Sequence, residues 1–520
     1  MHRRKLPIGI QTFREIREGD FYYVDKTPHA LKLINQGKYY FLSRPRRFGK
    51  SLFIDTVAEL FAGNEPLFRG LYVHDKWDWS VKYPVIRISF GGGVLRSREE
   101  LDRRVFDILR QNRENLGLNC ADPADVAGCF AELIRCAATK YGRRAVVLVD
   151  EYDKPILDNI SNHDLAREMR DGLRNLYSVI KDSDAHIKFA MLTGVSKFSK
   201  VSLFSGLNNL NDITLDAAYA TICGYTEADV DTVFAPELPG LDRDEVRRWY
   251  NGYCWLGEKV YNPFDLLLLF EKRDFRPYWF ETGTPTFLLD ILLQRRVFAP
   301  DLAKLQTSAD LLGRFEVNDI GTEALLFQTG YLTITAVDEP VRGRWVYTLG
   351  FPNLEVAGSL NEALVSTFGL DGQQAFRNRL AVLGALRQAD FSALREHFSA
   401  FFASIPHDWY RKNELDRFEG YYASVFYSHL AALGLDVRVE ESSSRGRVDL
   451  VLICEGGVYI FEFKVVEEAP EGKALAQIKA KDYAAKYRNR GEPVHLVGVE
   501  FARKTRNIVA FETARDAEGA

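Results

Sequence analysis

The stretch that most constrains this chain is an apolar run at residues 39–43, followed by a short basic loop and the start of a helix. The run has the composition of a short buried strand. In the loop, Gly49 lets the backbone approach a phosphate, Lys50 reaches the β- and γ-phosphates of a nucleotide, and the Ser51 hydroxyl can bind Mg²⁺. The pattern predicts a nucleotide-binding loop formed by Arg46, Arg47, Phe48, Gly49, Lys50 and Ser51.

One position departs from the common phosphate-binding pattern. That pattern has a glycine seven residues before the serine, where this chain has Arg44. For this stretch alone, a basic turn that caps a helix remains an alternative.

A second apolar run, at residues 145–149, ends in two acidic residues. An unbroken aliphatic run of this kind is typical of a strand buried on both faces of a parallel sheet. We expect Asp150 to hold Mg²⁺ and Glu151 to polarise the attacking water, because such strand ends lie at the same edge as the phosphate loop. The alternative is that these acids only cap a turn. After a further buried run at residues 186–192, Thr193 could sense the γ-phosphate or cap a helix or loop.

The composition indicates a globular protein with several domains. The chain has 520 residues, too many for one core, with 46% hydrophobic and 27% charged residues. The net charge of −4 excludes a protein that binds nucleic acid through an overall positive charge. A nucleic-acid site must therefore be a local basic patch. The six cysteines form no CxxC pair, and no apolar run reaches the roughly 20 residues of a membrane span. We therefore expect a cytoplasmic protein without a membrane partner.

Four domains are expected along the chain. Over residues 1–215, strands and helices alternate with long crossovers, which predicts an α/β domain with a parallel sheet covered on both faces. Residues 216–350 indicate a mainly helical, lid-like domain with winged-helix-like character and one β-hairpin. Residues 351–410 are expected to form a helical connector, and residues 411–520 a second α/β domain.

The last domain carries a second group of candidate site residues. Its pattern predicts the order helix, three strands, helix, strand, with a tight turn between two neighbouring strands. If the two-residue turn begins at Glu455, Asp449 lies opposite Glu462; if it begins at Gly456, Asp449 lies opposite Lys464. Side chains alternate along a strand, so both registers bring the two carboxylates and the lysine to one face. A three-residue turn would break this register unless a bulge restored it.

Paired acids on neighbouring strands offer the hard oxygen ligands that Mg²⁺ prefers, and a nearby lysine can stabilise charge on a phosphate. The alternative is a cross-strand ion pair on a solvated face. It agrees less well with the two phenylalanines that alternate with Glu462 and Lys464 in a strand expected to be central. The basic residues of segment 473–490 are expected on one helix beside this site, following a phosphate backbone or forming a solvated face.

The motifs of the last domain resemble those of the PD-(D/E)XK nuclease superfamily, at Glu419, residues 446–449, residues 462–464 and Gln477. Val448 stands where the superfamily's name has a proline, which is a common departure. The resemblance implies a restriction-endonuclease-like fold with a metal-dependent phosphodiesterase site formed by Asp449, Glu462 and Lys464. It also implies that metal or substrate is supported by Glu419 and Gln477.

The first part of the chain resembles the predicted AAA-ATPase-like family that is often fused to such a nuclease in bacteria. The likeness rests on residues 43–51, 148–155, 192–198, 249–253 and 261–263. Together the resemblances imply an ATPase, with ATP and Mg²⁺ as cofactors, that licenses cleavage of nucleic acid, with DNA favoured over RNA and a homo-oligomer left open. Two alternatives remain: an NTP-dependent sensor or scaffold that binds nucleic acid without cutting it, and a protein that holds a nucleotide without hydrolysing it.

Overall fold

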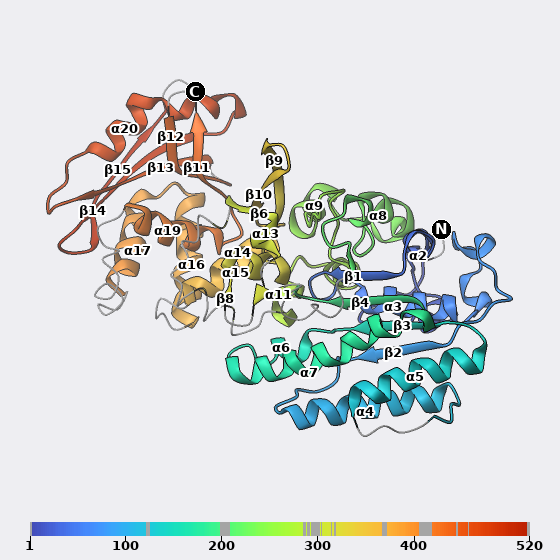
Figure 1. The fold of residues 1–520 in the computed structure, drawn as a ribbon. Coiled ribbons are helices and arrows are strands. Elements are labelled where there is room, and N and C mark those ends of the chain that lie inside the picture. Colours follow the sequence, from blue (N-terminus) through green and yellow to red (C-terminus); the bar gives the residue numbers. More distant parts are fainter. Residues whose placement is uncertain are drawn as a thin grey trace. The chain divides into compact units, whose positions relative to one another are not determined.

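The chain folds into two compact units, Met1–Gly283 with Leu305–Asn353 and Thr284–Lys304 with Leu354–Ala520. The computed structural model describes residues 3–120, 125–197, 209–283, 304–313, 319–366, 372–404, 419–443, 446–455 and 457–516, with a few short stretches between them. Each unit has its own central sheet (Figure 1). Among the described residues, no helix is both long enough and apolar enough to cross a membrane.

The first unit is built on a five-stranded sheet in which every pair of neighbours is parallel. The strands lie in the order β2 (Val85–Ser89), β3 (Ala145–Asp150), β4 (Ile187–Gly194), β1 (Tyr39–Ser43) and β5 (Asn211–Asp212). Strands β1 and β3 are buried along their whole length, as expected for strands covered by helices on both faces. The predicted parallel α/β sheet is confirmed, and β4 lies between the two strands that carry the candidate site.

The helices that accompany this sheet begin in different ways. They are α1 (Phe13–Glu18), α2 (Thr27–Gln36), α3 (Lys50–Phe61), α4 (Arg98–Asn115), α5 (Val126–Tyr141), α6 (Lys154–Leu157) and α7 (His163–Asp182). The side chains of Ser97, Asp125 and Asn162 each accept a backbone N–H from the first turn of the helix that follows. Helix α3, like α1, α2 and α6, has no side-chain cap, and it is preceded by Gly49 in a left-handed conformation.

The lid-like part of the first unit packs around an apolar core that it shares with Tyr22 and Val24 of the N-terminal segment. Its helices are α8 (Glu227–Val233), α9 (Arg243–Tyr250), α10 (Pro263–Lys272) and α11 (Tyr278–Gly283). A three-stranded antiparallel sheet follows, in the order β6 (Leu305–Ser308), β10 (Arg344–Gly350) and β9 (Thr333–Val341). With α13 (Ala309–Leu312) and α14 (Thr322–Thr329), it forms the winged-helix-like arrangement and contains the predicted hairpin.

The second unit is built on a mixed five-stranded sheet. Its strands lie in the order β11 (Asp436–Ser443), β12 (Gly446–Cys454), β13 (Gly457–Val466), β14 (Val494–Ala502) and β15 (Asn507–Arg515). Only β13 and β14 pair in parallel. Its helices are α15 (Leu354–Ser366), α16 (Gly372–Arg387), α17 (Phe391–Ser404), α19 (Glu419–Ala431) and α20 (Lys473–Lys481).

The two faces of this sheet are covered by different helices. Phe461 and Phe463 of β13 contact Phe426 of α19. On the opposite face, Ile460 lies in one apolar cluster with Ile478 of α20. Because side chains alternate along a strand, Glu462 and Lys464 lie on the same face of the sheet as α20.

Two features of the second unit differ from the sequence prediction. The predicted basic helix ends at Lys481, because Asp482 adopts a left-handed conformation with φ 47° and only two short 3-10 turns follow. Strand β15 was not predicted. Its outer half is exposed, so it lacks the apolar pattern of the buried strands, and its pairing with β14 is what defines it.

Candidate nucleotide and nuclease sites

In this structure, the lysine of the phosphate loop donates hydrogen bonds to backbone oxygens of the same loop. Gly49 has φ 92°, a left-handed conformation that favours glycine, and it immediately precedes α3. Lys50 is buried, and its Nζ donates to the backbone oxygens of Arg44 and Pro45, both at 2.9 Å. Burial lowers the pKa of the Lys50 ammonium, while the nearby Asp150 carboxylate opposes this shift. The Lys50 side chain is therefore held against the backbone of the loop that is predicted to bind a phosphate.

Arg44, at the expected glycine position, is directed into the protein interior. Its guanidinium carbon lies 4.2 Å from the centre of the Trp255 ring. Its nitrogens donate to the backbone oxygens of Ser43, Thr214 and Tyr219 at 2.8, 3.0 and 3.2 Å. Burial lowers the pKa of Arg44 to about 10. Arg44 fixes the loop from behind, a role that the sequence pattern does not reveal.

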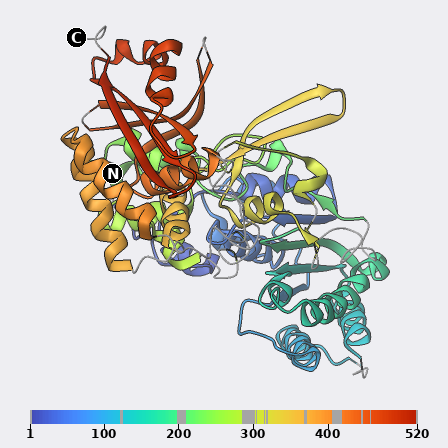
Figure 2. The same cartoon turned by 90° about the vertical axis from the view of Figure 1, so that its left-hand side faces the viewer.

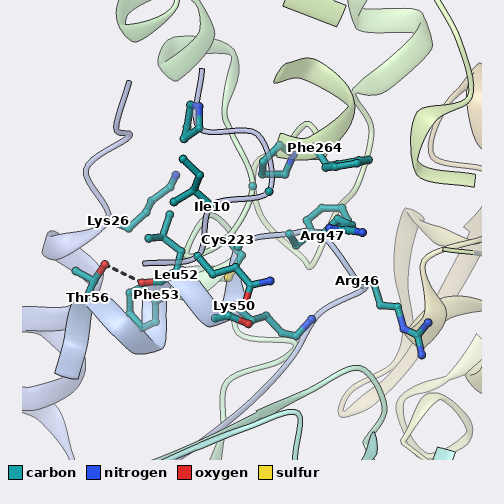
Figure 3. A pocket seen from close by; sticks show the side chains of 18 of the residues that line it. Ile10, Lys26, Arg46, Arg47, Lys50, Leu52, Phe53, Thr56, Cys223 and Phe264 are labelled. Atoms are coloured by element: carbon teal, nitrogen blue, oxygen red, sulfur yellow. Dashed lines mark hydrogen bonds between the residues drawn. The ribbon is translucent and has the colours of Figure 1, made fainter. Parts of the chain in front are cut away.

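The next residues of the loop point in different directions. The guanidinium carbon of Arg47 lies 4.6 Å from the centre of the Phe264 ring, near the start of α10. Figure 3 shows Arg46 directed away from the other labelled side chains. The Phe48 ring packs edge-on against Tyr253, with ring centres 4.7 Å apart. Phe48 can therefore offer a phosphate only its backbone.

The two acids after β3 lie in different environments. Asp150 is buried and accepts the Thr193 hydroxyl at 2.8 Å, and its Oδ1 also accepts the backbone N–H of Glu151 at 3.1 Å. The structure thus places Thr193, which is fully buried at the end of β4, as a hydrogen-bond partner of Asp150. Glu151 lines a cavity, where burial and then the Asp150 carboxylate raise its pKa, while Lys50 opposes the rise. A raised pKa suits a carboxylate that accepts a proton from water.

Asp153 is a further acid of this strand end that the sequence analysis did not single out. It is buried and accepts the backbone N–H of Val195 at 3.1 Å, together with the Ser196 N–H at 2.6 Å and hydroxyl at 2.5 Å. Burial raises the pKa of Asp153, and the hydrogen bonds from Ser196 oppose this. A β-carbon on Gly194 would lie 2.5 Å from Asp153 Oδ1, so this position accommodates only glycine. Asp153 therefore connects the loop after β4 to the segment that follows β3.

A cavity of about 480 Å³ connects these parts (Figure 3). Its polar lining includes Gly49, Lys50, Ser51, Glu151 and Asp153. Its apolar lining includes Ile10, Tyr23, Leu52, Phe264 and Leu267. Polar groups beside a helix N-terminus, together with apolar side chains in a cavity of this size, suit the triphosphate and the base of one nucleotide.

The N-terminal segment contributes Pro7 and Ile10 to the cavity lining and is bound to the lid-like part through one buried acid. Glu237 is fully buried, and its Oε1 accepts Arg3 Nε at 2.8 Å and the Tyr22 hydroxyl at 3.0 Å. Arg273 Nη1 donates to the Glu237 backbone oxygen at 2.6 Å. The Arg3 side chain is 60% exposed, whereas Glu237 is buried and needs these partners. The contacts connect the N-terminal segment to the lid-like part.

In the second unit, the strand register places the predicted nuclease residues together. Strands β12 and β13 pair in the first of the two predicted registers, in which Leu450 lies opposite Phe461. One residue beyond that pair, Asp449 Oδ2 accepts the backbone N–H of Phe463 at 2.8 Å. The carboxylate thus replaces a ladder hydrogen bond at the point where the strands separate. Gly456 of the predicted turn lies outside the described residues.

Glu462 is the centre of this site. It is buried, and its Oε1 accepts both Gln477 Nε2 and Lys464 Nζ, the latter at 3.1 Å; Lys464 Nζ also donates to the Phe463 backbone oxygen at 3.1 Å. Burial and then the Asp449 carboxylate raise the pKa of Glu462 to about 7, and Lys464 opposes this. Among the residues that the structure describes, no hydrogen-bond donor reaches Glu462 Oε2. A buried carboxylate oxygen without a donor is costly unless a cation binds it.

These residues fit a divalent cation. Asp449 and Glu462 provide hard oxygen ligands, and Glu462 Oε2 has a free coordination position. Within the described part of the chain, no group of three or more His, Cys, Asp or Glu side chains could hold a metal ion. The candidate ligands that the described residues offer here are therefore two carboxylates, those of Asp449 and Glu462. Glu419 begins α19, but its side chain lies outside what the structure describes.

Glu500 is a second buried acid of this domain that the sequence analysis missed. It lies on β14 in register with Lys464, and its carboxylate accepts the backbone N–H groups of Glu471 and Lys473, both at 2.6 Å. Burial acts to raise the pKa of Glu500, but these N–H groups prevail and lower it. An acid at a helix N-terminus is stabilising, and this one anchors α20, the helix that carries Gln477. Its only sequence signal is one acid within an apolar strand.

The predicted basic patch beyond Lys464 is partly neutralised within its own domain. Ion pairs join Arg488 to Asp482 and Asp516, Arg490 to Glu492, and Lys473 to Glu471. Lys479 and Lys481 are exposed on α20, next to the site. A nucleic-acid backbone that approaches α20 would therefore contact Lys479 and Lys481.

We expect Mg²⁺ to raise the melting temperature more at about pH 8 than at about pH 5.5, because a proton on Glu462 competes with the cation. In the metal-free protein, the folded-state pKa of Glu462 is about 7, compared with an ordinary value of 4.5. The contribution of Glu462 to the free energy of unfolding is thus fully present below about pH 4.5 and is lost as the pH rises to about 7. Thermal unfolding with and without Mg²⁺ measures both effects. Glu462→Gln should show neither, and an equal Mg²⁺ shift at both pH values would contradict the assignment.

Comparison with known proteins agrees with both resemblances. The profile described as "Predicted AAA-ATPase" matches residues 7–204, and the profile described as "PD-(D/E)XK nuclease superfamily" matches residues 417–511. A protein of Azotobacter chroococcum mcd 1, described as "Uncharacterized protein in vnfD 5'region", is 64% identical over 512 residues, which span 98% of this chain and 99% of that protein. The chain therefore belongs to the family of proteins that join a predicted AAA-ATPase domain to a C-terminal domain of the PD-(D/E)XK nuclease superfamily.

Proposed function

We propose that the protein hydrolyses ATP in its first unit and that this activity licenses Mg²⁺-dependent cleavage of nucleic acid, with DNA favoured over RNA, by its second unit. The observation that carries the proposal is the buried Glu462 Oε2, which has no donor among the described residues and belongs to a carboxylate whose pKa the nearby Asp449 helps to raise. A purely structural ion pair would satisfy both oxygens of a buried carboxylate.

In the first unit, polar residues in the cavity lining and directly behind it would have distinct roles. Lys50 would exchange the two backbone oxygens that it now contacts for phosphate oxygens, which form stronger, charge-assisted hydrogen bonds. Ser51 and Asp150 would hold Mg²⁺, and Thr193 would keep the Asp150 carboxylate oriented. Glu151 would accept a proton from the attacking water, because it lines the cavity and its pKa is raised.

In the second unit, Asp449 and Glu462 would hold the cation, which when bound polarises a phosphate and lowers the pKa of a water molecule. Lys464 would turn from Glu462 Oε1 to the scissile phosphate and stabilise the charge that develops there. Gln477 keeps Glu462 Oε1 in place through its own hydrogen bond. Because Gln477 and Lys464 both contact Oε1, Glu462 Oε2 would be available to the cation.

We also propose that the protein is cytoplasmic and assembles as a homo-oligomer. A cytoplasmic protein fits the free cysteines of the described chain. Arg46 is directed away from the other labelled residues of the cavity (Figure 3). In a homo-oligomer, its guanidinium would contact a nucleotide bound by a neighbouring copy.

The test is a cleavage assay on single- and double-stranded DNA and RNA with the unmodified protein. We expect cleavage that requires Mg²⁺, is lost on chelation, and is faster with ATP than without it. ATP hydrolysis is measured in the same samples. If ATP is hydrolysed, but no substrate is cleaved and Mg²⁺ produces no thermal shift, the protein is an NTP-dependent scaffold that binds nucleic acid without cutting it.

A further inference from the structure

The hairpin of β9 and β10 extends beyond the sheet to which it belongs. Strand β6 pairs only with residues 346–349 of β10, whereas β9 and β10 remain paired as far as Val341 and Arg344. Every residue from 335 to 345 is exposed. Figure 2 shows the two strands as a long projecting pair. We call residues 335–345 the hairpin arm.

The hairpin arm exposes large apolar side chains. Val337, Val341 and Trp345 are 44%, 64% and 46% exposed. They are three of the nine large hydrophobic side chains that are exposed in the described part of the chain, so this short segment concentrates them. A two-stranded hairpin is only marginally stable alone, and an exposed tryptophan is typical of a contact surface. Apolar exposure at such a tip therefore indicates a binding partner.

The charges of the hairpin arm point to the chemistry of that partner. Arg342 and Arg344 flank Gly343, whose φ of 78° makes the turn, and both guanidiniums are exposed at the tip. In the described part of the chain, no carboxylate lies within ion-pair distance of either arginine. The arm also carries two acids, Asp338 and Glu339, so its net charge is zero. Glu339 accepts the Gly343 N–H at 2.6 Å and so holds the turn. The two exposed arginines on either side of Gly343 form the positive end of the arm.

We propose that the hairpin arm binds a nucleic-acid duplex, with Arg342 and Arg344 contacting phosphates or entering the minor groove and Trp345 packing beside them. Narrow minor grooves attract arginine, and a two-stranded β-ribbon is narrow enough to follow a groove. The inference rests on the proposed function, because the hairpin arm would let the first unit bind the same nucleic acid that the second unit cleaves. Helix α14 offers no comparable surface, since most of its side chains are buried.

The test measures binding of the full chain to a fluorescently labelled DNA duplex, in metal-free buffer, over a range of salt concentrations. In the double variant Arg342→Ala with Arg344→Ala, we expect duplex affinity to fall by roughly tenfold or more and the salt dependence to decrease by about two units. The matched control, Arg103→Ala with Arg248→Ala, removes two exposed arginines of the same unit and should leave both quantities unchanged. Trp345→Ala should weaken binding at an unchanged salt slope.

The outcomes separate this inference from the proposed function. If the unmodified protein binds the duplex and the arm variant binds it with the same affinity and slope, the arm has another partner and the inference is overturned. In that case, Mg²⁺-dependent cleavage still supports the proposed function. If the unmodified protein binds neither DNA nor RNA duplexes, the inference and the nucleic-acid part of the proposed function both fail. Circular dichroism of each variant shows whether it is folded.

Discussion

Replacing Asp449 with asparagine should reduce nucleic-acid cleavage by about three orders of magnitude or more, because several kcal/mol of charge stabilisation by the cation are lost. The two candidate sites lie in separate units, so ATP hydrolysis should remain unchanged. Asparagine keeps an oxygen that can accept the Phe463 N–H, which Asp449 accepts at 2.8 Å. Cleavage assays on the purified variant measure the loss, and cleavage at the unmodified rate would contradict the proposed role of Asp449.

Two further variants separate a ligand from a catalytic group at this site. Asp449→Ala also removes the acceptor of the Phe463 N–H, so it should be less stable than Asp449→Asn by about 1 kcal/mol. Without metal, Asp449→Asn should be at least as stable as the unmodified protein, because the charge that helps to raise the pKa of Glu462 is gone. Lys464→Ala should retain the thermal shift with Mg²⁺ but lose cleavage. Loss of that shift would make Lys464 a structural residue.

Replacing Glu151 with glutamine should slow ATP hydrolysis by about two to three orders of magnitude while ATP binding is retained, because only the group that accepts a proton is removed. Asp150 remains beside Thr193 to hold Mg²⁺. Glu151 has φ 53°, a conformation that glutamine adopts as readily as glutamate, so the fold should be unchanged. Phosphate release measures hydrolysis, and the thermal shift with ATP measures binding.

The control for this prediction is Lys50→Ala. In the proposed function, the Lys50 ammonium exchanges the backbone oxygens of Arg44 and Pro45 for phosphate oxygens, so its removal should abolish the thermal shift with ATP. Glu151→Gln should preserve that shift. Unchanged hydrolysis in the Glu151→Gln protein would show that another residue activates the water. If both variants lose ATP binding, Glu151 has a structural role in the cavity.

Much of the fold was predictable because local rules determine it. The buried runs at residues 39–43 and 145–150 are strands of a parallel sheet, as their unbroken apolar composition indicates. The pairing of β12 with β13 follows from a tight turn and the alternation of side chains, which together bring Asp449 and Glu462 to one face. The family profiles match where these motifs lie.

The two errors in the second unit arose where local rules were insufficient. The end of α20 depends on Asp482 adopting a left-handed conformation, which a run of good helix formers does not reveal. Strand β15 is defined by its pairing with β14, and its exposed residues show no strong periodicity.

The composition and the order of the motifs in the sequence by themselves determined two α/β cores, a phosphate loop and a pair of acids beside a lysine. Only the tertiary structure decided what each polar residue contacts. Arg44 fills the glycine position because its guanidinium reaches Trp255, and Glu500 supports α20, which presents Gln477 to Glu462. These contacts join residues far apart in the chain, and strand order and helix packing bring them together. A sequence pattern records spacing along the chain, but a buried charge is stabilised by the groups that surround it in space.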